Sequence, residues 1–271
     1  MEFNCIVVLY NTKCEDSIGV NTLIEPKLHN LKIVICDNSE KIDIKENNKR
    51  FCNKLEIEYI DMKGNLGLSK AYNKALTRIN HDNWVVIFDQ DTIVSPNYFH
   101  ELNKSIVNYP NTYIHVPIVK SRGIRISPSV MRGYSVKSLA INNYGLYSNV
   151  TAINTGMAIK SCVFEKIGNY NEEIFMDYLD HYFIRKYNKY FKNIAIFNCE
   201  LAQEFSDHDH NDICKDLARF IIYKKDFYHF CNDSVYGYIF YLFKITYRTI
   251  KLSIYHKNIV FIRKLFEGNL K

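Results

Sequence analysis

Short apolar runs alternate with amphipathic stretches through the N-terminal part of the chain. The runs are rich in β-branched and aromatic residues, which is typical of strands buried on both faces of a parallel sheet. They cover residues 4–10, 31–36, 55–60 and 84–88. Helices are expected over residues 18–28 and 70–78, and another after Ser95 as N-cap with Pro96 at the first helical position. Strands that alternate with helices predict an α/β fold with a doubly wound, mostly parallel sheet.

The periodicity weakens in the middle of the chain. Residues 120–149 are rich in Ser, Gly, Tyr and Arg, and we expect long loops and short strands there. Residues 154–159 then predict a loop that enters a strand. The helical pattern over residues 177–190 would place Asp177 and Asp180 on one helix face.

Residues 236–266 are aromatic and basic. Lys244, Arg248 and Lys251 recur at helical spacing beside apolar positions such as Phe243. A basic stripe beside an aromatic face is typical of a helix that lies in a membrane interface. A helix packed on the rest of the chain, with solvated cations, is the alternative.

Length and composition limit the class of protein. The chain has 271 residues, 47% of them hydrophobic, which suits one large domain over residues 1–232 and a C-terminal amphipathic helical region over residues 233–271. The formal net charge of +6 is mild and favours an anionic partner such as a nucleotide or a membrane surface. The 8 cysteines form no Cys-x-x-Cys pair, so we expect reduced thiols in a cytosolic protein. No signal-peptide pattern and no run of about twenty apolar residues occurs, so we expect neither a leader nor a transmembrane span.

Polar side chains follow the predicted strands where each strand ends. Asn11 follows the first strand, Asp37 the second, and Asp89 with Asp91 the fourth. The carboxyl ends of parallel strands meet at one edge of a sheet, where such folds bind ligands. If the strand continues, Asp89 and Asp91 project to the same side and make a hard-oxygen site for Mg²⁺ or Mn²⁺. A polar loop that caps the next helix is the alternative.

Six motifs occur in a fixed order: VVLYN, DNS, GNLGLSKAYNKAL, VIFDQDT, NTGMAIK and IFMDYLDHYFIRK. Together they resemble the family 2 inverting glycosyltransferases with the A-type, nucleotide-sugar-binding fold. The chain looks most similar to bacterial rhamnosyltransferase-like members that build surface polysaccharides. The resemblance spans residues 4–230 and makes residues 1–232 the expected catalytic domain.

The resemblance implies a set of contacts to the nucleotide-sugar donor. In it, Asp37 accepts a hydrogen bond from the N3–H of a uracil or thymine ring, with an Asx turn as the alternative. Backbone N–H groups near Asn65 and Gly67 approach the nucleotide at a helix start. Asp89 touches the ribose or the metal, and Asp91 coordinates the metal. The full set of expected donor-binding residues is Asn11, Asp37, Asn65, Gly67, Asn73, Asp89 and Gly156.

Asp180 matches the general base of the family. An inverting transfer is one in-line displacement, which needs a carboxylate to take the proton of the acceptor hydroxyl and a cation to hold charge on the leaving diphosphate. Asp177, one turn earlier, would orient the site or contact the acceptor. Arg185 matches a basic position of the family. A solvated helix face is the alternative for all three residues.

The chain departs from the family after the last strand. A Leu-x-His-x-Leu-Ser pattern is usual there, and its His can complete the metal site, but this chain has Gln203 at that position. Glutamine is a poor transition-metal ligand but an acceptable oxygen donor. His208 is a substitute ligand, or it belongs to a loop before a helix capped by Asn211 or Asp212, which we favour.

The implied function is transfer of a sugar, with rhamnose as one candidate, from a UDP- or dTDP-sugar to a hydroxyl of a growing, lipid-linked surface polysaccharide. Mg²⁺ or Mn²⁺ would assist, and the protein would lie at the inner face of the cell membrane. A nucleotidyltransferase is the alternative enzyme, but its glycine- and arginine-rich N-terminal signature is absent from VVLYNTKCEDS. A nucleic-acid-binding protein would leave the aspartates unexplained, so we expect no nucleic-acid partner.

Overall fold

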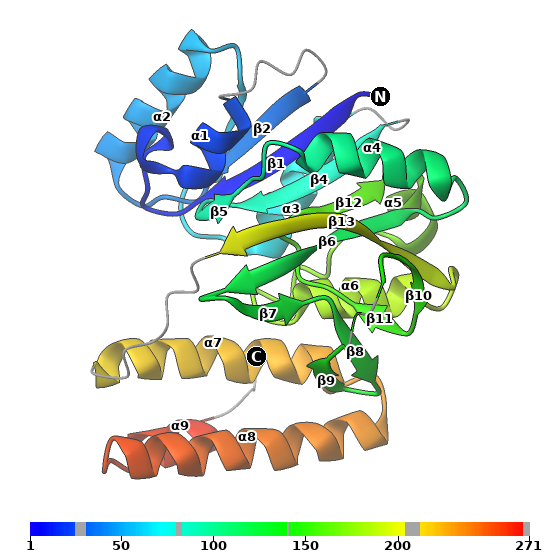
Figure 1. The fold of residues 1–271 in the computed structure, drawn as a ribbon. Helices are drawn as coiled ribbons and strands as arrows, with labels where there is room; N and C mark the ends of the chain where they lie inside the picture. The colour runs from blue at the N-terminus through cyan, green and yellow to red at the C-terminus, as the bar shows by residue number, and fades with distance from the viewer. Residues whose placement is uncertain (25–30, 80–82, 140, 142, 204–211, 268–271) are drawn as a thin grey trace.

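The computed structural model describes residues 1–24, 31–79, 83–139, 141, 143–203 and 212–267. Figure 1 shows a large sheet with helices on its two faces and a further layer of C-terminal helices. Within the described ranges, no helix has both the length and the apolar character needed to cross a membrane.

The large sheet is mixed and mostly parallel. Its strand order is β10-β13-β6-β12-β4-β1-β2-β3, with the short β5 beside β13 and β7 beside β6. β12 runs antiparallel to both β4 and β6, and β10 runs antiparallel to β13. The strands are β1 (Phe3–Leu9), β2 (Leu31–Asp37), β3 (Glu58–Asp61), β4 (Trp84–Asp89), β5 (Thr92–Ile93), β6 (Ile114–Ser121), β7 (Ile124–Ser127), β10 (Gly145–Ser148), β12 (Met157–Lys160) and β13 (Asn193–Gln203). The expected doubly wound, mostly parallel α/β fold is confirmed, with an antiparallel β12 near its centre.

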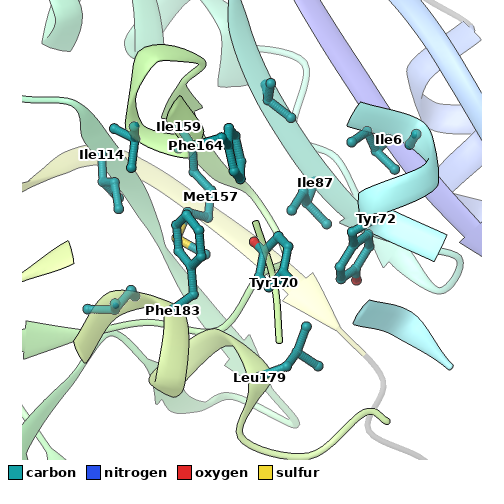
Figure 2. Close-up of a cluster of buried hydrophobic side chains, with 14 of the residues drawn as sticks. Ile6, Tyr72, Ile87, Ile114, Met157, Ile159, Phe164, Tyr170, Leu179 and Phe183 are labelled. Atoms are coloured by element: carbon teal, nitrogen blue, oxygen red, sulfur yellow. The ribbon is translucent and has the colours of Figure 1, made fainter. Parts of the chain in front are cut away.

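The sheet has a separate core on each face because successive strand residues point to opposite sides. In β1, Ile6 and Val8 face α3, α5 and α6, whereas Cys5 and Val7 face α1, α2 and α4. Figure 2 shows the first of these two cores. The helices are η1 (Cys14–Asp16), α1 (Ile18–Ile24), α2 (Ile42–Lys54), α3 (Leu68–Leu76), α4 (Tyr98–Asn108), α5 (Cys162–Ile167), α6 (Leu179–Tyr187), α7 (Ile213–Cys231), α8 (Val235–Tyr255) and α9 (Val260–Phe266).

The C-terminal helices form a third core. Phe220 and Phe227 of α7, Tyr241 of α8 and Phe261 of α9 are buried together. The expected helical region after residue 233 therefore shares its core with α7, and the helical layer begins at Ile213. The short strands expected in the middle of the chain include a second sheet, β11-β8-β9, made of β8 (Ser129–Arg132), β9 (Ser135–Ser138) and β11 (Val150–Thr151).

Three helices differ from the sequence predictions. The pattern did not predict α2, whose buried residues are few, although Ile44, Asn48 and Cys52 line one face at four-residue spacing. The helix after Ser95 begins at Tyr98, because the Ser95 hydroxyl donates to the Asn97 side chain rather than capping the helix.

The third difference concerns the helix that carries Asp180. It begins at Leu179, because Tyr178 has a left-handed backbone with φ of 63° and cannot continue a helix toward Asp177. Asp177 and Asp180 therefore do not share a helix face, and that prediction is wrong.

Candidate active site

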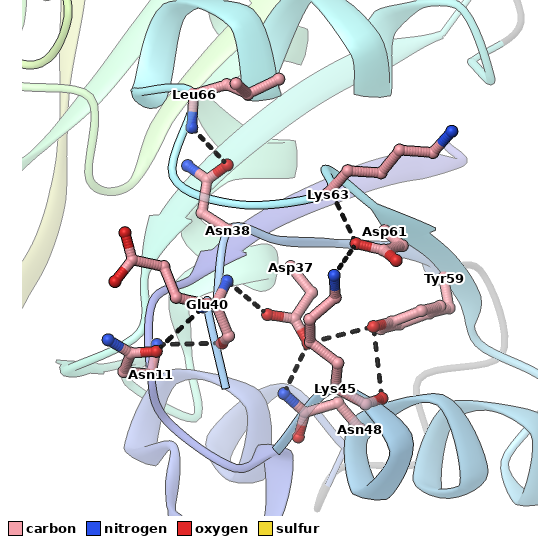
Figure 3. Close-up of polar contacts among 11 residues, drawn as sticks. Asn11, Asp37, Asn38, Glu40, Lys45, Asn48, Tyr59, Asp61, Lys63 and Leu66 are labelled. Carbon is pink, nitrogen blue, oxygen red and sulfur yellow. Dashed lines mark hydrogen bonds and ion pairs between the residues drawn. The ribbon is translucent and has the colours of Figure 1, made fainter. Parts of the chain in front are cut away.

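The ends of β1 and β2 form a polar network (Figure 3). The Asn11 backbone N–H donates to Ser39 Oγ at 2.9 Å, and the Glu40 N–H donates to Asn11 Oδ1 at 3.1 Å. Asn38 accepts from the Leu66 N–H and donates to the Gly67 carbonyl at 3.2 Å. These contacts fix the first two strand ends to the loop before α3.

Asp37 lies at the centre of this network and is fully buried. Its carboxylate accepts from the Ser39 N–H at 2.9 Å, the Asn48 amide at 2.9 Å and the Tyr59 hydroxyl at 3.1 Å. The Ser39 contact is the Asx turn that was the alternative for this residue. Oδ1 accepts one of these bonds and Oδ2 accepts two, and the residue is fully buried, so the structure gives no direct support for contact with a nucleotide base.

Asp89 is the last residue of β4. Its backbone N–H donates to Thr155 Oγ1 at 2.9 Å, and its Oδ2 accepts from Gln203 Nε2 at 2.6 Å. The end of β4, the loop before β12 and the end of β13 thus meet at Asp89, although β6 and β12 separate β13 from β4 in the sheet. Asp91 lies in the turn that follows β4, so the strand does not continue to it as expected.

Electrostatics bring Asp180 into the same group. Burial raises the pKa of Asp89 to about 6, and the carboxylates of Asp91 and Asp180 act in the same direction, while hydrogen bonds from Thr155 and Gln203 oppose them. Asp89 and Asp180 also both raise the pKa of the buried Tyr72 hydroxyl, after burial itself. Asp91 and Asp180 therefore lie near enough to Asp89 to act on its charge, although burial is the main cause of its raised pKa.

Asp180 lies in the first turn of α6. Its Oδ1 accepts from the His181 N–H at 2.6 Å, and its side chain is 15% exposed. His181 Nδ1 makes a hydrogen bond with Thr151 Oγ1 at 2.7 Å, which holds the imidazole beside the carboxylate. Asp180 is thus a partly exposed acid with a fixed orientation.

Asp177 is directed away from this group. Its carboxylate makes an ion pair with Arg219 of α7, and burial raises its pKa while Arg219 opposes the rise. The shared helix face with Asp180 is therefore wrong, and the expected role of Asp177 in orienting the site or contacting the acceptor stays a prediction. Asp177 instead ties the start of α6 to the C-terminal helices.

Two predicted donor-binding residues, Gly67 and Asn73, make contacts within the chain. A Cβ on Gly67, where φ is 87°, would lie 2.6 Å from Phe175 Cδ2. Asn73 donates to the Tyr170 carbonyl and to Glu172, each at 3.0 Å. Both residues attach α3 to the segment before α6, and the Gly67 carbonyl also accepts from Asn38 at the end of β2.

Asn65 and Gly156 have local roles as well. Asn65 Oδ1 accepts from the Gly67 N–H at 3.3 Å, as in an Asx turn. Gly156 has φ of 72°, and a Cβ there would lie 2.5 Å from Leu201 Cδ1 and 2.7 Å from Pro117 Cγ. Its glycine identity follows from this close packing of β6, β12 and β13, so the structure gives no direct support for donor contact.

Arg185 is not a solvated charge. Its guanidinium donates to the Phe230 carbonyl at 2.7 Å, pairs with Asp233 at 3.2 Å and stacks on the rings of Tyr134 and Phe230. It connects α6 to the C-terminal helices.

The proposed metal ligands are the carboxylates of Asp89 and Asp91 and the amide of Gln203. Gln203 Oε1 is buried and has no hydrogen-bond partner among the described residues. A buried, unsatisfied oxygen beside two carboxylates fits a hard cation that prefers oxygen ligands. No group of three or more His, Cys, Asp and Glu side chains suited to a metal occurs in the described ranges, and His208 lies outside them.

Sequence reasoning did not select several residues that build the site. Thr155 lies inside the NTGMAIK motif, so its contact with Asp89 could have been suspected. His181 follows the predicted base directly. Arg219 and Asp226 of α7 carry no motif, and only their seven-residue spacing, which places them on one helix face, gives any signal.

Comparisons with known proteins identify the family and the fold of the chain. The sequence profile of "Glycosyl transferase family 2" matches residues 5–168. The chain belongs to this family. The likeness to "dTDP-rhamnosyl transferase RfbF" of Shigella flexneri is 25% identity over 183 residues, which is 65% of this chain and 59% of that protein.

Solved structures share the fold. The crystal structure of S. aureus TarS matches with a TM-score of 0.59 at 17% identity, over 82% of this chain and 40% of TarS. A structure of TarS residues 1–349 in complex with UDP matches with a TM-score of 0.58 at 16% identity, over 85% of this chain and 72% of that one. At these identities the comparison establishes the fold alone. The chain thus spans 59% of its curated relative and 40% of full TarS.

Proposed function

We propose that this protein is an inverting glycosyltransferase that moves a sugar from a nucleoside-diphosphate sugar to a hydroxyl group. The observation that carries the proposal is the arrangement of three acids. Asp89 ends β4 and accepts from Gln203 at the end of β13, Asp91 lies in the turn that follows, and Asp180 lies in the first turn of α6, near enough to act on the charge of Asp89. Two acids serve the donor and one serves the acceptor, as a single displacement requires.

Asp180 is the general base in this proposal. It is partly exposed, fixed by the His181 N–H and adjacent to the donor-side acids. It takes the proton of the acceptor hydroxyl as the new glycosidic bond forms and the bond to the diphosphate breaks. The Thr151–His181 contact keeps this carboxylate oriented before the acceptor arrives.

A divalent cation, Mg²⁺ or Mn²⁺, would be held by Asp89, Asp91 and Gln203. Once bound, such an ion supplies positive charge to the leaving diphosphate. Gln203 would bind the cation through Oε1, which has no hydrogen-bond partner among the described residues, while its Nε2 donates to Asp89. His208 is a further candidate outside the described residues.

We propose dTDP-rhamnose as the first donor to test, because the curated relative is named a dTDP-rhamnosyl transferase. UDP-sugars come second, because TarS structures hold UDP and UDP-GlcNAc. The test is the thermal shift of the full chain with dTDP-rhamnose, UDP-GlcNAc, GDP-mannose and the free nucleotides, each with and without Mn²⁺, followed by transfer assays. If none of these ligands raises the unfolding temperature of the chain, the proposal that it uses a nucleotide sugar is wrong.

The acceptor is proposed to be lipid-linked, with α8 resting on an anionic membrane. Ile239, Phe243, Tyr247, Ile250 and Ile254 form an exposed apolar stripe along α8, at helical spacing. The opposite face of α8 is buried against α7 and α9, so this stripe is a second apolar face.

The charges on and near α8 also suit an anionic membrane as its partner. No acidic residue occurs between positions 235 and 266, whereas Lys244, Lys251 and Lys257 are exposed there. Arg248 departs from the predicted basic stripe, since it stacks on Tyr223 with its guanidinium carbon 3.8 Å from the ring centroid. A cationic surface around apolar side chains suits anionic headgroups. Binding to lipid vesicles tests this part of the proposal.

A further inference from the structure

The backbone just before α6 is held by one buried carboxylate from the C-terminal helices. Asp226 of α7 is fully buried, and its Oδ1 accepts from the Phe175 N–H at 2.7 Å. Its Oδ2 accepts from the N–H groups of Met176 and Asp177, each at 2.8 Å. Three charge-assisted hydrogen bonds offset the cost of burying a carboxylate.

The same segment is held from the other side by α3. The Phe175 carbonyl accepts from the Leu68 N–H at 2.7 Å, and the Ile174 carbonyl accepts from the Ser69 hydroxyl. The α3 helix therefore binds the carbonyl groups of this segment, and Asp226 binds its N–H groups. The backbone of residues 174–177 is therefore held in the position that satisfies the hydrogen bonds of its carbonyl groups and of its N–H groups together.

Further contacts join α7 to this turn. Arg219, two helical turns before Asp226, pairs with the Asp177 carboxylate. The Tyr178 ring stacks on Phe230 with centroids 4.8 Å apart. Because Tyr178 immediately precedes the helix that carries Asp180, these contacts set where that helix begins.

We propose that Asp226 is a positioning residue, which holds residues 175–177 so that Asp180 meets the acceptor hydroxyl. The inference rests on the proposed function of Asp180 as base. A shift of about 1 Å in a reacting group can cost roughly a hundredfold in rate. Asp226, Arg219 and Phe230 of α7, which contact this turn, therefore act on the position of Asp180.

The experiment is Asp226→Asn in the full chain, with hydrolysis of dTDP-rhamnose to rhamnose and dTDP, and of UDP-GlcNAc to GlcNAc and UDP, as activity probes in which water takes the place of the acceptor hydroxyl. Asparagine retains an acceptor but presents an NH₂ group to one of the three N–H donors. We expect kcat to fall about a hundredfold while the KM for the donor stays within about twofold. Hydrogen exchange of the amides of residues 175–177 should be slow in the parent and faster in the variant.

Lys224→Met is the matched control. Lys224 is also a buried charge on α7, but its Nζ donates to the carbonyls of Lys264, Leu265 and Glu267 at the end of α9. This variant should lose stability and keep kcat within about twofold of the parent. If Asp226→Asn does not fold, Asp226→Glu retains the charge and tests the same position.

The outcomes separate the two proposals. A folded Asp226 variant with unchanged kcat, an equal fall in Lys224→Met, or rapid exchange of residues 175–177 in the parent overturns the positioning role. If the parent releases neither dTDP nor UDP from the two probes, the proposed function itself is wrong.

Discussion

At the scale of single residues, proton transfer depends on Asp180. Asp180→Asn keeps the shape of the side chain and removes its basicity, so we expect kcat to fall by roughly 10²–10⁴-fold, the usual contribution of a positioned base. Donor affinity, measured by calorimetry with dTDP-rhamnose, should change little. Asp43→Asn, an exposed acid in the first turn of α2, is the control. Lost donor binding with normal turnover per bound donor would assign Asp180 to another role.

Asp91 carries the metal proposal. We expect Asp91→Asn to abolish transfer while the fold survives, because a neutral amide binds a divalent cation much more weakly than a carboxylate. Calorimetric titration with Mn²⁺ measures the weakened cation binding, and circular dichroism measures whether the fold survives. Asp61→Asn, at the end of β3 and paired with Lys45, serves as control. Substantial activity of folded Asp91→Asn at saturating Mn²⁺ would remove the metal assignment.

At the scale of elements, His115 joins β6 to α4 in its neutral form. Its Nε2 donates to the Thr112 carbonyl at 3.2 Å, so its Nδ1 accepts from the Ser105 hydroxyl at 2.7 Å. Burial lowers the pKa of His115 to about 4. The unfolded chain takes up this proton near pH 6.5 and the folded chain does so only near pH 4.

The contribution of His115 to the free energy of unfolding should therefore be complete above pH 6.5. It should fall by roughly 3 kcal/mol as the pH is lowered toward 4. His115→Gln should make the unfolding free energy, measured by urea titration, less dependent on pH across this window. His100→Gln, at an exposed position of α4, should leave the pH dependence of the parent unchanged. If the unfolding free energy of His115→Gln depends on pH as steeply as that of the parent, His115 is not the group responsible for this dependence.

The sequence predicted elements whose cause is local. The apolar runs predicted β1, β2 and β4 to within a residue or two, because burial on both faces leaves a continuous hydrophobic signature. The start of α6 was not visible, because it depends on Asp226, which lies far along the chain. The strongly polar α2 was missed because few of its side chains are buried.

Only part of the candidate site could be predicted, because some of its residues have a local sequence signal whereas others depend on contacts with distant residues. Asp89, Asp91 and Asp180 follow strand ends or a helix start, and the structure brings them together. Gly67 and Gly156 were assigned to the donor, but their glycine identity follows from packing against Phe175 and Leu201. A glycine needed for close packing and one needed for ligand approach look the same in a sequence.

At the scale of the whole molecule, α8 presents its apolar stripe to solvent on the outer side of the helical layer (Figure 1). We expect sedimentation with anionic vesicles that weakens with salt, and little binding to neutral ones. Replacing Lys244, Lys251 and Lys257 with Gln should remove about 3 kcal/mol of attraction, or roughly a hundredfold in partitioning. Transfer to a soluble acceptor analogue should be unaffected.

The control is Lys49, Lys54 and Lys70 replaced with Gln, which changes the net charge equally on the main domain. It should bind vesicles like the parent. If the α8 variant also sediments as well as the parent does, the stripe is not a membrane surface.

The antiparallel β12 also determines when the sheet can be completed during synthesis. It lies between β4 and β6 in the sheet but follows both in the chain. Until Met157–Lys160 leaves the ribosome, β4 and β6 each keep an open edge, and β6 gains its other long neighbour only with β13. Unpaired strand edges are templates for association with other chains. The nascent chain thus carries an open edge on β4 while residues 90–160 are made, and one on β6 while residues 122–160 are made, until β12 covers both.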